Sequence, residues 1–165
     1  MGIQVRGVET TTLRLDNIVD RTNRKVYALM EQAAKETKRR VELQAHRDTG
    51  ALEKSIRIRK LSRAGRNGRT SFEVFIDPNR RRRRRTRTGA VTRQRVITYA
   101  RRLESGAWGQ SLGPGSRRKA REVKNIDPTL KVGTSFFWRS SMYIEAIYKR
   151  KIEKAVREVV RSQRR

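Results

Sequence analysis

The pairing of Glu122 with Lys124 is the arrangement in this sequence that could carry out metal-dependent chemistry. Some nucleases use a Glu-x-Lys triplet to hold a divalent cation and to orient a water molecule. Such a site also needs an aspartate shortly before the triplet, and no fitting one is present. The five aspartates are spread along the chain without a close strand-borne pair: Asp16, Asp20, Asp48, Asp77 and Asp127. We therefore interpret the triplet as a solvated segment of mixed charge, and a nuclease is the least favoured function.

A single histidine, His46, is the other side chain that could act as a ligand or a base. The chain has no cysteine, which excludes disulfides and cysteine-based zinc sites. We interpret His46 as a residue beside a turn. The sequence contains neither a phosphate-cradling glycine loop nor a nucleophile elbow. It therefore predicts no catalytic residue, no metal and no cofactor, and a protein that is not an enzyme.

Six consecutive arginines, Arg80 to Arg85, suggest a different chemistry, which is binding of a polyanion. No acidic residue occurs between Pro78 and Leu103. Arginine contacts to phosphate need no particular base sequence, and roughly ten of them would make binding steeply dependent on salt. The alternative is a solvated loop without a partner. We predict that DNA or an acidic partner is contacted by Arg80, Arg81, Arg82, Arg83, Arg84, Arg85, Arg87, Arg93 and Arg95.

The charge of the whole chain supports the same interpretation. Its 165 residues include 43 Lys and Arg against 16 Asp and Glu, a formal net charge of +27. An isolated domain with this charge repels itself, so we expect a polyanion or an acidic protein around it, with nucleic acid as the leading candidate. The length suits a single domain over residues 1–165. No signal-peptide pattern or membrane-spanning run is visible, so we expect a soluble protein and no membrane partner.

Apolar residues at three-four spacing predict two helices, a long one over 16–43 and a second one over 140–161. Between them, alternation over 56–59 and 71–77 predicts an antiparallel hairpin, with Asn67-Gly68 as its turn. We predict an arginine-rich loop over 78–95, a strand or short helix over 96–103, and a long glycine-containing loop over 107–135. The order of these elements predicts an α+β fold. It has a long N-terminal helix, a small antiparallel sheet with a hairpin, and a C-terminal helix.

A sequence-specific DNA reader is not favoured. A helix-turn-helix over 97–115 would place Gly109, Gly113 and Pro114 inside its second helix, which they would break. Trp108 and Trp138 could stack on bases, but Trp138 lies in an apolar cluster and is predicted to belong to the core.

Three segments resemble, in their order and spacing, the motifs of a family of tailed-bacteriophage proteins. The stretch DTGALEKSI at 48–56 is similar to the family's D-T-G-x-L-x-x-S-I entry to its first strand. The stretch YARRLESG at 99–106 is similar to a Y-A-x-x-V-E-x-G segment, and FFWR at 136–139 is similar to the entry to the last helix. The family comprises the head–tail joining or tail-completion proteins of the phage neck.

The resemblance implies a structural virion protein, assembled in the host bacterial cytoplasm and located in the neck or tail. Copies would form a ring, with a hexamer favoured over a dodecamer, around the channel between the head connector and the tail. Its partners would be other neck, connector and tail proteins and the genomic DNA in the channel. The motif residues are expected to be structural rather than catalytic: Asp48, Thr49, Gly50, Leu52, Ser55, Ile56, Tyr99, Ala100, Glu104, Gly106, Phe137 and Trp138. The alternative function is a stand-alone basic nucleic-acid-binding protein.

Overall fold

The computed structural model describes residues 8–46, 50–62, 70–85, 88–105, 114–133 and 135–162. It confirms the predicted α+β class, with a long N-terminal helix, antiparallel hairpins and a C-terminal helix. The elements follow in the order α1 (Val8–Gln44), the 3-10 turn η1 (Glu53–Ser55), β1 (Ile56–Ser62), β2 (Thr70–Ile76), β3 (Arg81–Arg85), β4 (Val91–Arg95), α2 (Val96–Glu104), α3 (Pro114–Ile126) and α4 (Phe136–Ser162).

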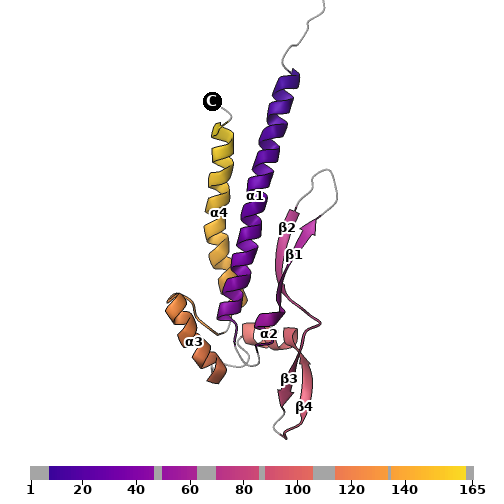
Figure 1. Cartoon of the computed structure of the whole chain (residues 1–165), viewed down its shortest axis with the longest axis vertical. Coiled ribbons are helices and arrows are strands. Elements are labelled where there is room, and N and C mark those ends of the chain that lie inside the picture. Colours follow the sequence, from indigo (N-terminus) through magenta and orange to yellow (C-terminus); the bar gives the residue numbers. More distant parts are fainter. Residues whose placement is uncertain are drawn as a thin grey trace, which may run out of the picture.

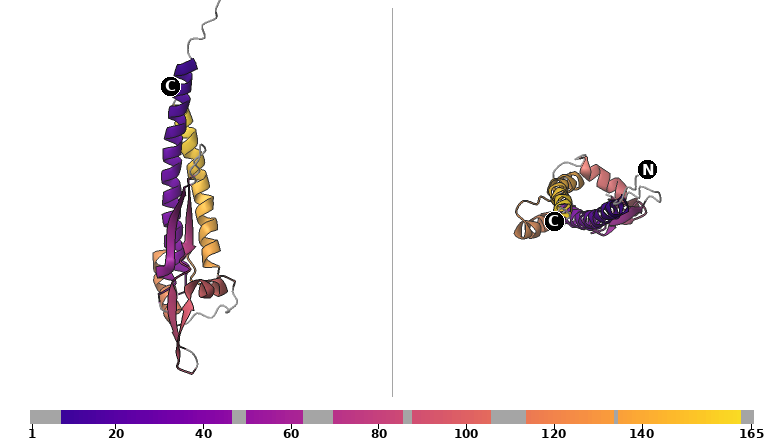
Figure 2. Two further views of the ribbon diagram at one scale, coloured as in Figure 1. Left: turned by 90° about the vertical axis from the view of Figure 1, so that its right-hand side faces the viewer. Right: turned by 90° about the horizontal axis from the view of Figure 1, so that it is seen from above.

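Helices α1 and α4 lie side by side and run in opposite directions (Figures 1 and 2). Their pairing buries apolar residues of both helices at helical spacing, including Val41 of α1 and Ile144 of α4. Polar groups inside the pair are matched. The Gln44 amide donates a hydrogen bond to Ser140 Oγ at 3.0 Å, and the Tyr148 hydroxyl donates one to Glu36 Oε2 at 2.9 Å. Burial and the Glu36 carboxylate together raise the pKa of Tyr148 to about 12.

The predicted hairpin is confirmed as β1–β2, with Ile56 opposite Ile76 and Ile58 opposite Val74. It lies along α1, where the rings of Tyr27 and Phe72 are 5.3 Å apart (Figure 1). The predicted turn at Asn67-Gly68 lies outside the described residues. One core joins the foot of α1 to η1, β1, α2 and the start of α4. Its buried residues are Val41, Ala45, Leu52, Ile56, Val96, Tyr99, Ala100, Leu103 and Phe136.

The prediction of a loop over 78–95 is wrong, because most of this segment forms a second antiparallel hairpin, β3–β4. We call it the arginine ribbon, residues 81–95. Gly89, at φ +83°, lies in the segment that joins the two strands, and the positive φ suits glycine. A run of one residue type has no alternation of polar and apolar side chains, so the pattern carried no strand signal. Backbone pairing with the VTRQR segment of β4 makes the arginines a strand.

The prediction of a loop over 107–135 is also wrong for the central part of this segment, where α3 spans Pro114–Ile126. Residues 107–113 lie outside the described part of the chain. Proline is well tolerated at the first position of a helix, so Pro114 starts α3 rather than preventing it. The segment from 96 is the short helix α2 rather than a strand.

The start of α4 corrects a further prediction. The helix begins at Phe136, four residues before the predicted start, and Phe136 is fully buried while Phe137 is half-buried. Trp138 was predicted to belong to the core, but its exposed fraction is 62%. Two residues turn an α-helix by about 200°, so Trp138 faces away from the side that carries Phe136.

Candidate functional site

The pleat of β3 divides the arginine run into two sets of side chains. Successive residues of a strand point to opposite faces, so Arg81 and Arg83 share one face and Arg82 occupies the other. The register of the ribbon places Arg95 opposite Arg81 and Arg93 opposite Arg83. All four are exposed. We call Arg81, Arg83, Arg93 and Arg95 the arginine quartet.

The arginine quartet consists of two pairs of like charges placed directly across a hairpin. Cross-strand neighbours have Cβ atoms about 5 Å apart, and like charges at this spacing destabilise the pairing. None of the four has an ion-pair partner among the described residues. The ribbon extends from the foot of the molecule, beyond the α1–α4 pair (Figure 1). The quartet is therefore a concentrated cationic surface that an anion would stabilise.

Arg82 has a different role from the quartet. It is only 5% exposed, and its Nη2 donates a hydrogen bond to Gln94 Oε1 at 3.0 Å. Its guanidinium carbon lies 3.6 Å from the centre of the Tyr99 ring, a close cation–π contact with α2. The sequence prediction that Arg82 contacts a partner is therefore wrong, because its side chain is buried within the subunit. Instead it fastens the ribbon to the core.

The remaining predicted contact residues are distributed around the ribbon. Arg80 is exposed just before β3. Arg84 and Arg85 belong to β3, but their side chains lie outside the described part of the chain, and Arg87 lies outside it altogether.

The first motif of the resemblance forms the entry to β1. Gly50 has φ +71°, a conformation that favours glycine. Leu52, Ser55 and Ile56 are buried, and Ser55 Oγ donates to the Leu52 carbonyl at 2.6 Å. Asp48 and Thr49 lie outside the described residues, as does Gly106 of the second motif. Within that second motif, Tyr99 and Ala100 belong to the buried core.

Glu104, at the end of α2, caps the first turn of α4. Its Oε2 accepts a hydrogen bond from the backbone N–H of Phe137 at 3.1 Å, and its Oε1 accepts one from Trp138 at 2.9 Å. The first N–H groups of a helix have no partner within the helix, and a carboxylate there also interacts favourably with the helix dipole. The second and third motifs of the resemblance are thus in direct contact, which the sequence alone did not reveal.

Replacing Glu104 by alanine is expected to lower the free energy of unfolding by about 1–2 kcal/mol, the usual cost of losing a helix N-cap. Glu104→Gln keeps one acceptor oxygen, so its free energy of unfolding should fall by less than that of Glu104→Ala. Urea denaturation followed by circular dichroism measures both. The matched control is Glu145→Ala, an exposed position on α4. Equal stabilities of Glu104→Ala and the control would contradict the capping role.

Lys119 of α3 is a buried cation that sequence analysis did not single out. Its side chain is 2% exposed, and Nζ donates to Glu53 Oε1 at 2.6 Å, to the Ala45 carbonyl at 2.7 Å and to the Glu42 carbonyl. The last carbonyls of a helix lack partners within it, and a cation there also matches the helix dipole. Lys119 therefore ties α3 to the end of α1 and to η1.

His46 lies beside this lysine, and its side chain is buried. Its Nδ1 is 3.3 Å from Ser116 Oγ, and its Nε2 is buried without a hydrogen-bond partner among the described residues. Burial, followed by the positive charge of Lys119, lowers the pKa of His46 below its ordinary value of 6.5. The imidazole is therefore neutral in the folded protein at neutral pH.

Because the folded state resists protonation of His46, acidification should destabilise the protein. The stabilising contribution of the neutral ring is complete above pH 6.5 and is lost as the pH falls through the lowered pKa. In His46→Gln this contribution is absent. Free energies of unfolding measured from pH 8 to pH 5 should therefore fall more steeply for the natural chain than for the variant. Parallel pH profiles would contradict this account.

The Glu122–Lys124 pair does not form a metal site with other residues of the described chain. Both residues are exposed on α3, and the Glu122 carboxylate is 3.4 Å from Arg118. Among the described residues, no group of three His, Cys, Asp or Glu side chains could hold a metal ion.

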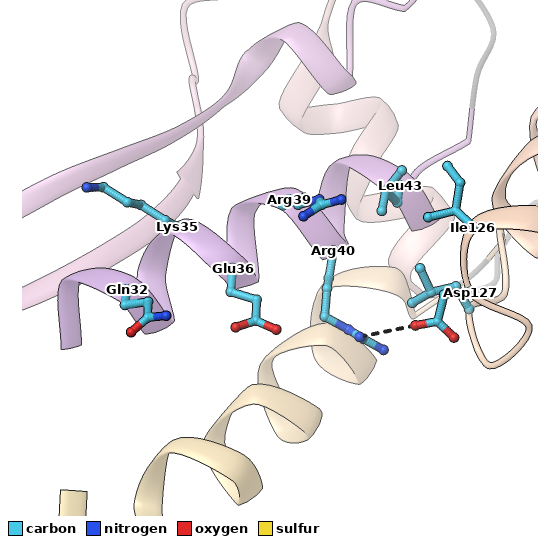
Figure 3. Close-up of a pocket in the computed structure, with 9 residues that line it drawn as sticks. Gln32, Lys35, Glu36, Arg39, Arg40, Leu43, Ile126 and Asp127 are labelled. Atoms are coloured by element: carbon cyan, nitrogen blue, oxygen red, sulfur yellow. Dashed lines mark ion pairs between the residues drawn. The ribbon is translucent and has the colours of Figure 1, made fainter. Parts of the chain in front are cut away.

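An open groove of about 550 Å³ lies between the C-terminal half of α1 and the segment that follows α3 (Figure 3). Arg40 occupies it, 3.5 Å from Asp127 and 3.7 Å from the centre of the Tyr143 ring. Hydrogen bonds from Thr129, together with Arg40, lower the pKa of Asp127. Arg40 and Asp127 of this groove are paired with each other, whereas the arginines of the quartet face like charges across the hairpin. Its lining consists of Gln32, Lys35, Glu36, Arg39, Arg40, Leu43, Ile126, Asp127 and Leu130.

Comparisons with protein-family models, curated proteins and solved structures find no match to this chain. Within the described residues, no helix has the length and apolar character needed to cross a membrane.

Proposed function

We propose that this chain is a structural protein of the bacteriophage neck, which forms a ring that joins or completes the tail at the head connector. Its basic surface would face DNA or acidic neighbours, and it would catalyse no reaction. The proposal starts from the sequence motifs. Its structural support is that Glu104 brings the second and third motifs together at the start of α4, while the first motif forms the turn and strand beside them.

The observation that carries the proposal is the arginine quartet. Four exposed arginines are paired across one hairpin without an acidic partner among the described residues, in a chain of net charge +27. Such a subunit gains stability from an assembly that brings anionic groups to this surface. A neck ring around a DNA channel provides that environment. The ring contacts would use the faces of α1 and α4 that are not packed in the core, together with residues 107–135.

The same surface supports the alternative, a stand-alone basic nucleic-acid-binding protein. The two functions differ in what the chain does without nucleic acid. A neck protein closes into a defined ring through protein contacts, whereas a stand-alone binder stays small.

The test is the mass of the purified chain, freed of nucleic acid by nuclease and high salt. Native mass spectrometry and negative-stain microscopy should reveal a closed oligomer, six copies being favoured over twelve. A monomer at all protein concentrations, together with salt-dependent DNA binding, would favour the alternative and contradict the neck proposal.

A further inference from the structure

We propose that the arginine ribbon binds the phosphate backbone of duplex DNA, without base-sequence preference, through Arg81, Arg83, Arg93 and Arg95. This inference deepens the proposed function, because that function leaves open whether DNA or an acidic protein meets the basic surface. It also divides the arginine run by role. The quartet makes the contact, and Arg82 holds the ribbon in place.

The spacing of the quartet suits a dense row of phosphates. Residues two apart on one strand are separated by about 7 Å, and residues opposite each other have Cβ atoms about 5 Å apart. The four guanidinium groups therefore originate from one small patch. Duplex DNA carries one negative charge per about 1.7 Å of its axis, so several phosphates lie within reach of such a patch. Guanidinium groups bind phosphate oxygens in bidentate geometry, which makes arginine well suited to this contact.

The ribbon is held rigidly enough to present this surface. Arg82 packs on Tyr99 of α2 and donates to Gln94 of β4, so both strands are fixed to each other and to the core. β4 also continues directly into α2 at Val96, whose N–H donates to the Arg80 carbonyl at 2.9 Å. A two-stranded ribbon of this kind has the dimensions to follow a DNA groove.

The composition of the exposed face favours nucleic acid over an acidic protein. Stable protein interfaces have a core from which charged residues are depleted and in which aromatic side chains are enriched. The quartet has the opposite character. Val91, 59% exposed at the outer end of β4, is the one exposed large apolar side chain among the described residues of the ribbon. Protein–DNA interfaces are more polar and much more positively charged than protein interfaces, as this face is.

We expect the quartet to contact phosphates rather than bases, because of its residue type and because the described part of its face has no other polar side chain that could read a base. Arginine can also read guanine, but base reading also uses asparagine, glutamine or carboxylate groups to fix the other bases. On the quartet's face all the described polar side chains of the ribbon are arginines. Gln94 lies on the other face, where it accepts from Arg82. We therefore expect equal affinity for unrelated sequences.

The experiment compares two variants that each lose four positive charges. The ribbon variant is Arg81→Gln/Arg83→Gln/Arg93→Gln/Arg95→Gln. The control is Lys54→Gln/Arg57→Gln/Arg59→Gln/Lys60→Gln, which neutralises four exposed cations of η1 and β1, away from the helix faces proposed for the ring contacts. Fluorescence anisotropy measures binding to two unrelated 30-base-pair duplexes between 50 and 200 mM NaCl. Thermal denaturation without DNA checks folding, and the ribbon variant should be at least as stable as the natural chain because like-charge repulsion is removed.

The slope of log affinity against log salt counts the phosphate contacts. Four lost contacts should reduce its magnitude by about 3.6 in the ribbon variant and by less than about 1 in the control. Over the fourfold rise in salt, the natural chain should therefore lose about 150-fold more affinity than the ribbon variant. Both duplexes should give the same values. If the fourfold variant does not fold, Arg83→Gln/Arg93→Gln replaces it, with an expected reduction of about 1.8.

Three results would overturn the inference. Equal slopes for the ribbon variant and the control would mean that the DNA contacts are spread over the basic surface and are not concentrated on the ribbon. A strong preference for one duplex would mean base reading. Displacement of the DNA by polyglutamate at equal charge concentration would mean that any polyanion, an acidic protein included, occupies the site. Oligomeric mass, measured on the same samples, keeps the two proposals separate. If the chain forms a ring but the ribbon variant keeps the salt slope of the natural chain, only the DNA-binding inference is contradicted. If the ribbon variant has the reduced slope but no ring forms, only the neck function is contradicted.

Discussion

Replacing Lys119 by methionine is expected to lower the free energy of unfolding by about 3–5 kcal/mol, the range for breaking a buried ion pair by removing one partner. The Nζ group of Lys119 satisfies two carbonyls at the end of α1 and pairs with Glu53, and the side chain is 2% exposed. Methionine fills a similar volume but donates no hydrogen bond. The carboxylate of Glu53 and both carbonyls would then be left without this donor in a largely buried site.

The matched control is Lys124→Met on the same helix. Lys124 is exposed, so its replacement should change stability by no more than about 0.5 kcal/mol. Urea denaturation of both variants gives the comparison. Adding Glu53→Gln to Lys119→Met should recover part of the loss, because the negative charge that faced Lys119 is then also removed. If Lys119→Met and Lys124→Met had the same stability, Lys119 would not tie α3 to α1.

Replacing Phe136 by alanine is expected to cost about 3–5 kcal/mol, the typical effect of removing a fully buried phenylalanine. Phe136 is 0% exposed and belongs to the core that joins α1, β1, α2 and α4. The ring of Phe137 lies next to it, with 6.3 Å between ring centres. Truncation would therefore leave a cavity at the point where these elements meet. The change should lower the denaturation midpoint without altering the helical content of the folded state.

The neighbouring Trp138 provides the control. It is a larger residue in the same helical turn, but its 62% exposed fraction predicts a change within about 0.5 kcal/mol for Trp138→Ala. The pair of variants thus tests which aromatic side chain at the start of α4 belongs to the core. If Trp138→Ala lowered the free energy of unfolding strongly and Phe136→Ala did not, Trp138 rather than Phe136 would belong to the core, and this account would be wrong.

The sequence predicted the elements whose side-chain pattern is regular. Ile56 and Ile58 alternate with arginines, and Val74 and Ile76 lie two residues apart between the acidic residues Glu73 and Asp77. The β1–β2 hairpin could therefore be predicted directly. The long helices were visible through their apolar stripes. The start of α4 could not be predicted, because three consecutive aromatic residues do not indicate which one faces the core. The predicted start was four residues late, and Trp138, predicted for the core, is exposed while Phe136 is buried.

Elements held by polar contacts could not be predicted. On the buried face of α3, Val123 is preceded at helical spacing by Lys119 and Ser116, so the apolar stripe is too short to recognise. The partners of Lys119 are backbone carbonyls distant in sequence, which no local pattern reveals. The capping of α4 by Glu104 also depends on a contact between segments 33 residues apart.

The candidate site was predicted in outline and corrected in detail. The uninterrupted arginines indicated a polyanion partner. However, a uniform run does not reveal the pleat that buries Arg82 and exposes Arg81 and Arg83. Nor does it reveal the register that brings Arg93 and Arg95 opposite them. These facts depend on tertiary structure, and they turn a charge run into a defined surface of four residues.

Cryo-electron microscopy of the virion that contains this chain tests the central claim most directly. The neck proposal predicts a closed ring at the head–tail junction, in which each subunit shows the antiparallel α1–α4 pair and directs its arginine ribbon toward DNA in the channel. Mass spectrometry of the same particles should detect the chain among the virion proteins. Particles that lack it, or copies found as single subunits on DNA without a ring, would contradict the account.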